Sequence, residues 1–140
     1  MTVLFVCNKN TGRSQIAAAL YNKYAVNGRA DSAGTDVGSE GTMRERAAIA
    51  PAAQRVIDDM KVVEGIDISD SPRTQLNEAM LADYDSIVVI ADAETLPKYM
   101  KNHIYIHWDI ADPVSQSDEE HTKTIETIKA QVMSMLSYNN

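Results

Sequence analysis

The sequence predicts an α/β fold, a three-layer α/β/α arrangement in which a four-stranded parallel sheet has helices on both faces. Strand-like apolar runs alternate along the chain with helical patterns, and such alternation is typical of parallel sheets with helical crossovers. The first run, residues 2–6, is apolar almost throughout, as expected of a strand covered on both faces. The 140 residues fit one domain of this kind, residues 1–140.

Three further segments, rich in β-branched or apolar residues, are predicted to complete the sheet. They are residues 29–33, 85–91 and 103–108.

Helical spacing of apolar residues, together with a proline or asparagine near some of the starts, predicts five helices. They are residues 14–24, 51–62, 77–84, 93–100 and 121–136, of which 93–100 is interrupted by Pro97. Residues 37–50, rich in Gly, Ser and charge, are predicted to form a long surface loop.

Composition excludes several classes of function. The formal net charge is -7, from 13 basic and 20 acidic residues, so we expect no nucleic-acid partner. No run approaches the ~18 apolar residues of a membrane span, so we expect no membrane association. A single cysteine, Cys7, rules out an internal disulfide. Together these features indicate a soluble, cytoplasmic protein.

The turn from Cys7 to Ser14, CNKNTGRS, connects the first predicted strand to the first predicted helix. Ligands of parallel sheets bind beyond the carboxyl ends of the strands, and the N–H groups of such turns and helix starts bind tetrahedral anions. We therefore predict a phosphate-binding loop in which glycine eases the turn. It comprises Asn8, Lys9, Asn10, Thr11, Gly12, Arg13 and Ser14.

Within this loop Cys7 is predicted to be the nucleophile. The N–H dipoles, the helix start and Arg13 all favour a thiolate over a thiol. The planar guanidinium of Arg13 can bind two oxygens of the captured anion. A lone cysteine after a strand is otherwise a small buried apolar residue, and the surrounding strand, glycine and helix favour the catalytic interpretation.

Ester hydrolysis also needs a proton donor for the leaving group. The segment after the fourth predicted strand offers Asp109 and Asp112. Asp112 is the better candidate because Pro113 restricts its loop, although Asp-Pro is also a common surface turn.

Two polar residues of the loop are predicted to organise it. Ser14 can cap the first helix and donate a hydrogen bond to the Cys7 sulfur, and Asn10 can bind loop backbone groups. The three histidines lack metal-ligand spacing, so no metal site is predicted.

These residues resemble the low-molecular-weight protein tyrosine phosphatase family and the arsenate reductases of the same fold, over nearly the whole chain. The resemblance is carried by residues 7–14, DSAGT at 31–35, GIDIS at 65–69 and Asp-Pro at 112–113. It implies that Cys7 is the nucleophile, Arg13 the oxyanion clamp and Asp112 the general acid and then base. It also implies a four-stranded parallel sheet with helices on both faces, and no cofactor.

The chain departs from that pattern in informative places. Gly12 stands where the phosphatases commonly carry a second cysteine, and Val114 and Ser115 replace the tyrosines that often follow the Asp-Pro pair. Gln15 resembles the arsenate reductases, and Thr11 resembles family members that prefer phosphoarginine.

The first predicted function is therefore a phosphomonoesterase that acts on a phosphorylated protein or a small phosphoester, with phosphotyrosine and phosphoarginine as open alternatives. The second is an arsenate reductase, which with only one cysteine needs an external low-molecular-weight thiol such as mycothiol. A phosphocarrier domain, against which Arg13 counts, and a non-catalytic oxyanion sensor complete the alternatives.

Overall fold

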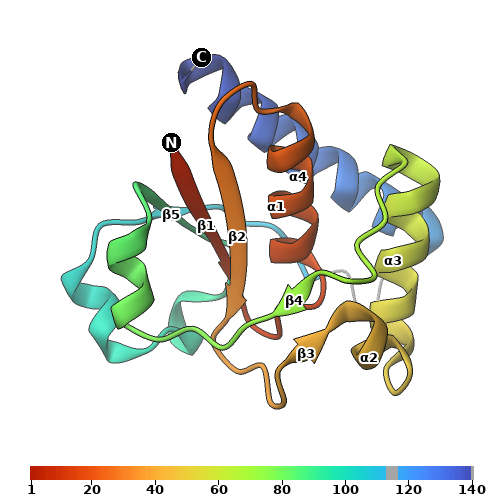
Figure 1. The fold of residues 1–140 in the computed structure, drawn as a ribbon, viewed down its shortest axis with the longest axis horizontal. Coiled ribbons are helices and arrows are strands. Elements are labelled where there is room, and N and C mark those ends of the chain that lie inside the picture. Colours follow the sequence, from red (N-terminus) through yellow and green to blue (C-terminus); the bar gives the residue numbers. More distant parts are fainter. Residues whose placement is uncertain (113–116, 140) are drawn as a thin grey trace.

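A computed structural model describes residues 1–112 and 117–139, and its main sheet has four strands (Figure 1). In spatial order these are β2 (Arg29–Gly34), β1 (Thr2–Cys7), β5 (Ser86–Val89) and β6 (Ile106–His107). Each neighbouring pair is parallel. The predicted fold class, with its four-stranded parallel sheet, is confirmed, and the third and fourth strands are shorter than predicted.

The sheet is buried on both faces. Successive side chains of β1, at the centre of the sheet, point alternately into two apolar clusters, one on each face. Val3 and Phe5 belong to one cluster, whereas Leu4 and Val6 belong to the other. All four side chains are fully buried. Such burial accounts for the almost continuous apolar run of the first strand.

Three α-helices cover the first face, namely α1 (Arg13–Tyr24), α3 (Pro51–Glu64) and α4 (Asp118–Asn139). Figure 1 shows α1 and α4 side by side, and the two helices are in contact. Ile16 and Leu20 of α1 and Ile125 and Ile128 of α4 are fully buried in the same cluster. The apolar stripes predicted from sequence therefore face the sheet.

The second face is covered by 3₁₀ turns instead of the α-helices predicted over 77–84 and 93–100. These turns are η1 (Ala79–Asp83), η2 (Ala93–Thr95) and η3 (Lys98–Asn102). The N-cap of η1 is Glu78 and not the predicted Asn77, although the Asn77 Oδ1 does accept from the Met80 N–H at 3.0 Å. Pro97 separates η2 from η3, as expected of a residue that lacks the N–H an α-helix needs.

The predicted surface loop over 37–50 is wrong in part, because it contains a short strand and a helix. β3 (Gly41–Thr42) pairs antiparallel with β4 (Pro72–Arg73), and α2 (Met43–Ala47) follows at once. The Thr42 hydroxyl accepts from the Glu45 N–H, and the Glu45 carboxylate accepts from the Thr42 N–H. This reciprocal cap starts the helix, and Met43 is fully buried.

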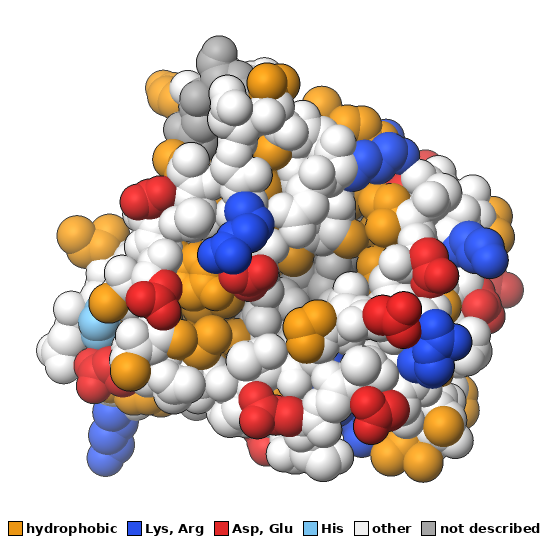
Figure 2. All heavy atoms as spheres, viewed as in Figure 1, with side chains coloured by type: hydrophobic (Ala, Val, Ile, Leu, Met, Phe, Trp, Pro, Cys, Tyr) orange, Lys and Arg blue, Asp and Glu red, His pale blue; other side chains and the backbone are white. Residues whose placement is uncertain are grey.

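Charged side chains are dispersed over one face of the molecule (Figure 2). On the face shown in Figure 2, basic and acidic groups are interspersed, with no single basic patch. No helix in the described part of the chain is long and apolar enough to cross a membrane.

Candidate active site

The turn between β1 and α1 lies at the carboxyl edge of the sheet, where strand ends from distant parts of the chain meet. The N–H of Ile90, just after β5, donates to the Val6 carbonyl at 2.7 Å, and the Trp108 N–H, just after β6, donates to the Val89 carbonyl at 2.9 Å. The segment 108–112 therefore begins beside the end of β5, at the same edge of the sheet as the end of β1, as predicted from the parallel topology.

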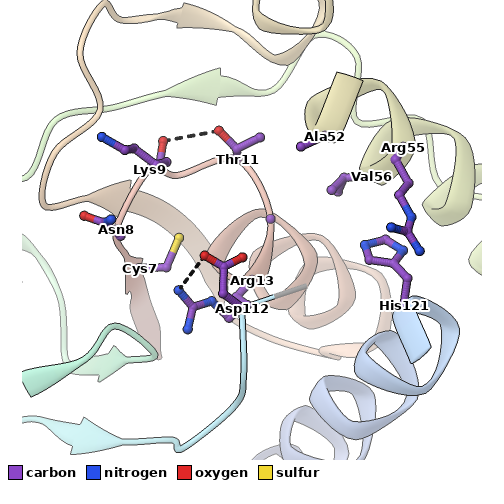
Figure 3. Close-up of a pocket in the computed structure, with 11 residues that line it drawn as sticks. Cys7, Asn8, Lys9, Thr11, Arg13, Ala52, Arg55, Val56, Asp112 and His121 are labelled. Carbon is purple, nitrogen blue, oxygen red and sulfur yellow. Dashed lines mark hydrogen bonds and ion pairs between the residues drawn. The ribbon is translucent and has the colours of Figure 1, made fainter. Parts of the chain in front are cut away.

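No side chain caps the start of α1, whose N-cap is Gly12. The first N–H groups of a helix have no partner within the helix, and here they border the loop that begins at Cys7 (Figure 3). Ser14 lies inside the first turn, so the prediction that it caps the helix is wrong. A helix start without a capping side chain favours an anion as the partner of its amides.

Ser14 instead contacts the cysteine, with its Oγ 2.9 Å from the Cys7 Sγ. Both residues are almost fully buried. The sequence-based prediction that Ser14 hydrogen-bonds the sulfur agrees with this geometry.

Asn10 organises the loop through a buried network. It adopts a left-handed backbone, with φ of 55°, a conformation that asparagine tolerates better than most residues. Its Oδ1 accepts from the Thr74 N–H at 2.8 Å. Its Nδ2 donates to the hydroxyls of Ser14 at 2.7 Å and Ser32 at 2.9 Å. Ser32 and Thr74 were not predicted as site residues, although Ser32 falls in one of the segments that carry the family resemblance.

A close backbone approach packs the start of the loop against β2. The N–H groups of Thr35 and Asp36 donate to the carbonyls of Cys7 and Asn8 at 3.0 and 2.9 Å. A Cβ on Gly34 would lie 2.6 Å from the Asn8 carbonyl oxygen, so only glycine fits there. The Lys9 ammonium donates a hydrogen bond to the Asp36 carboxylate. This contact lowers the pKa of Asp36 below its usual value.

Arg13 is held in place by the backbone of the two segments that follow β5 and β6. Its Nη1 donates to the carbonyls of Ile90 and Ile110, both at 2.9 Å, and only 7% of the residue is exposed. Its Nη2 lies 3.8 Å from the Asp112 Oδ2. These contacts fix the orientation of the guanidinium before any ligand binds.

Asp112, and not Asp109, faces the site. Asp112 lines the same pocket as Cys7 and Arg13, and its side chain is 58% exposed (Figure 3). Asp109 is an exposed residue between the buried Trp108 and Ile110, and it does not line the pocket. The predicted restraint by Pro113 lies outside the described residues.

The pocket has a second wall, which sequence reasoning missed. Ala52, Arg55 and Val56 of α3 and His121 of α4 lie across from the loop (Figure 3). The apolar pattern of α3 identified Val56 only as a core residue, and the absence of metal spacing left His121 without a role. His121 is buried, and its Nδ1 is hydrogen-bonded to the Asp59 carboxylate.

The structure brings the predicted residues together around this pocket. Its lining includes Cys7, Asn8, Lys9, Thr11, Gly12, Arg13 and Asp112. Asn10 and Ser14 support the loop from behind, through the contacts described above. In the described part of the chain, no group of three or more His, Cys, Asp or Glu side chains could hold a metal ion.

The chain matches the sequence model of the family described as low molecular weight phosphotyrosine protein phosphatase over residues 2–138. Among curated protein sequences, none matches this chain.

Several solved structures resemble this chain over nearly its whole length. A low-molecular-weight protein tyrosine phosphatase from T. tengcongensis is 27% identical, with a TM-score of 0.78 over 99% of both chains. An arsenate reductase in the phosphate binding state is 25% identical, with a TM-score of 0.74 over 98% of this chain and 97% of that one. An arginine phosphatase from Geobacillus stearothermophilus is 22% identical, with a TM-score of 0.75 over 98% of this chain and 91% of that one, and it shares the fold.

Proposed function

Because the chain belongs to the low-molecular-weight phosphotyrosine protein phosphatase family, we propose that it hydrolyses phosphomonoesters through a phosphocysteine formed on Cys7. One observation carries this proposal. Cys7, the buried Arg13 and the exposed Asp112 border one pocket at an uncapped helix start. A nucleophile, an anion clamp and a proton donor are the three groups that the reaction needs.

In the first step the Cys7 thiolate attacks phosphorus in line, so that an S–P bond forms while the P–O bond to the leaving group breaks. Asp112 donates its proton to the departing oxygen. The loop amides and Arg13 hold the three equatorial oxygens, where charge accumulates in the transition state.

In the second step water attacks the phosphocysteine. Asp112, now a carboxylate, takes a proton from the water, and the S–P bond breaks to release phosphate and regenerate the thiolate. The Ser14 hydroxyl supports sulfur both as attacker and as leaving group, since it lies at hydrogen-bond distance from the sulfur.

The substrate is a phosphorylated protein or a small phosphoester. No Phe, Tyr or Trp is among the described residues that line the pocket, and residues 113–116 are Pro, Val, Ser and Gln. Neither set of residues therefore offers a Phe, Tyr or Trp ring that could stack on an aromatic leaving group. Phosphotyrosine and phosphoarginine are both candidates, and with phosphoarginine a P–N bond would break in place of the P–O bond. Thr11, which resembles family members that prefer phosphoarginine, lines the pocket.

Arsenate reduction is the second candidate, favoured by the similarity to an arsenate reductase structure. Cys7 would form an S–As bond with arsenate and expel water. An external thiol such as mycothiol would then attack the sulfur, so that As(V) leaves as As(III) and a mixed disulfide forms on Cys7. A second thiol molecule would reduce that disulfide, because the chain has no other cysteine. No bound cofactor is needed in either reaction.

Steady-state hydrolysis of p-nitrophenyl phosphate tests the proposal, with Cys7→Ser as the blank. We expect phosphate release that the Cys7→Ser variant lacks. Arsenate with and without mycothiol or glutathione forms the parallel arm. Negligible hydrolysis together with thiol-dependent arsenite formation would reverse the order of the two functions.

A further inference from the structure

Arg73 is a buried arginine that neither the catalytic steps nor the sequence motifs have used. It lies at the end of β4 and is only 3% exposed. Its Nη2 donates to the carbonyl of Lys9, in the phosphate-binding loop, at 2.9 Å. The same guanidinium donates to the carbonyls of Val37 and Ser39, also at 2.9 Å. It therefore ties the phosphate-binding loop to the segment that follows β2.

The contact with Lys9 has a direct consequence for anion binding. A carbonyl oxygen turned toward a bound oxyanion would repel it. Arg73 draws the Lys9 carbonyl toward itself, away from the anion, and so helps to leave the loop N–H groups available to the oxyanion.

The charge of Arg73 is not neutralised by a carboxylate. No ion pair formed by the described residues includes Arg73. The carbonyl groups that accept from Nη1 and Nη2 carry no net charge, and the buried Nε has no hydrogen-bond partner. The positive charge of the buried guanidinium is therefore not cancelled by its hydrogen bonds. Burial and the nearby Arg46 lower the pKa of Arg73, whereas negative charge on Cys7 raises it.

We propose that Arg73 is a positioning residue of the active site that also supplies a second positive charge for the Cys7 thiolate and the bound oxyanion. Arg13 binds the anion from the side of β5 and the Ile110 segment, and Arg73 acts through the loop backbone from the side of β4. The inference rests on the proposed function in taking Cys7 as the nucleophile. Its test, however, needs no turnover.

Two substitutions separate the charge from the geometry. Arg73→Met removes both the charge and the three hydrogen bonds, and Arg73→Lys keeps the charge but loses the planar fork. Arg44→Met is the matched control, because Arg44 is an exposed arginine of α2 that pairs with Asp70. The readouts are the dissociation constant of inorganic phosphate and the rate of Cys7 alkylation by iodoacetamide near neutral pH.

We expect Arg73→Met to weaken phosphate binding and to slow alkylation by about tenfold each, as the loss of one partly screened charge implies. Arg73→Lys should recover most of the alkylation rate but less of the phosphate affinity, and Arg44→Met should match the wild type. Wild-type values of both quantities in Arg73→Met, or equal losses in the Lys and Met variants, would overturn the proposal.

A second measurement leaves Arg73 intact, in case Arg73→Met does not fold. Replacing Cys7 with serine removes the negative charge and should shift the guanidinium ¹⁵N resonances of Arg73, with those of Arg44 unchanged. Unshifted Arg73 resonances would contradict the electrostatic coupling. Failure of hydrolysis alone, with phosphate binding and alkylation as expected, would count against the proposed function and not against Arg73.

Discussion

The hydroxyl of Ser14 lies 2.9 Å from the sulfur of Cys7, and the network around Asn10 determines which of the two donates. The backbone N–H of Thr74 can only donate, so the atom that it contacts on Asn10 is the carbonyl oxygen. The other end of the amide, Nδ2, therefore donates to the Ser14 oxygen at 2.7 Å. The Ser14 proton is left for the sulfur, where it stabilises a thiolate.

Ser14→Ala should therefore lower kcat by about 10- to 100-fold. A hydrogen bond to a charged group contributes about 1.5–3 kcal/mol, and each 1.4 kcal/mol corresponds to about tenfold in rate. The steady-state rate with p-nitrophenyl phosphate measures the effect, and Ser134→Ala, at an exposed position of α4, is the control. An unchanged kcat in Ser14→Ala would show that the hydroxyl does not support the sulfur.

Asp112→Asn should slow hydrolysis relative to the wild type, and the loss of rate should grow with the basicity of the leaving group. A general acid contributes about 10²- to 10⁴-fold, and a phenolate that leaves readily needs it least. We expect the kcat of Asp112→Asn to fall steeply across a series of substrates from p-nitrophenyl phosphate to alkyl phosphates. Asp109→Asn is the matched control, since Asp109 is exposed and lies outside the pocket lining. Equal losses for all leaving groups would exclude Asp112 as the proton donor.

Asn10→Ala should destabilise the fold by about 2–4 kcal/mol. It removes three side-chain hydrogen bonds, each of about 1 kcal/mol, and places a less tolerant residue at a positive φ. Asn10→Gly separates the two effects because glycine accepts this backbone conformation at no cost. Urea unfolding of both variants provides the measurement. A glycine variant as unstable as the alanine variant would show that the backbone conformation contributes nothing.

Glu64 links three helices and should make stability depend on pH. Burial alone would raise its pKa, but hydrogen bonds from Tyr24 and Lys129, with the charges of Lys129 and Lys23, outweigh burial and lower it. A folded-state pKa below the unfolded one adds stability above about pH 4.3, and this stability is lost as the pH falls through the folded-state pKa.

The free energy of unfolding of Glu64→Gln should accordingly fall below that of the wild type near neutral pH. The difference should shrink as the pH drops through the acidic range. Glu126→Gln, at an exposed position of α4, serves as the control. A difference that stays constant from pH 7 to pH 3 would refute this account of Glu64.

The sequence predicted the parallel sheet well because its signals are local. Residues 2–6 form an apolar run that only burial on both faces explains, and the helix after the CNKNTGRS turn carries a clear apolar stripe. The same local signals identified Cys7, Arg13 and Asp112, which the structure places around one pocket.

Long-range contacts account for what was missed. Thr74 reaches Asn10 across 64 positions of sequence, and no local pattern in the sequence indicates that pairing. His121 lines the pocket because α4 packs against α1 and α3. The reciprocal cap of Thr42 and Glu45, by contrast, was a readable signal in the segment predicted as a loop.

The most direct test of the account is a single-turnover reaction with a phosphoester, quenched in acid and analysed by mass spectrometry of the peptide that contains Cys7. We predict a phosphoryl group on the Cys7 sulfur that appears before free phosphate and accumulates further in Asp112→Asn. Phosphate released with no modified Cys7 at any time, or a phosphoryl group on another residue, would contradict the central claim.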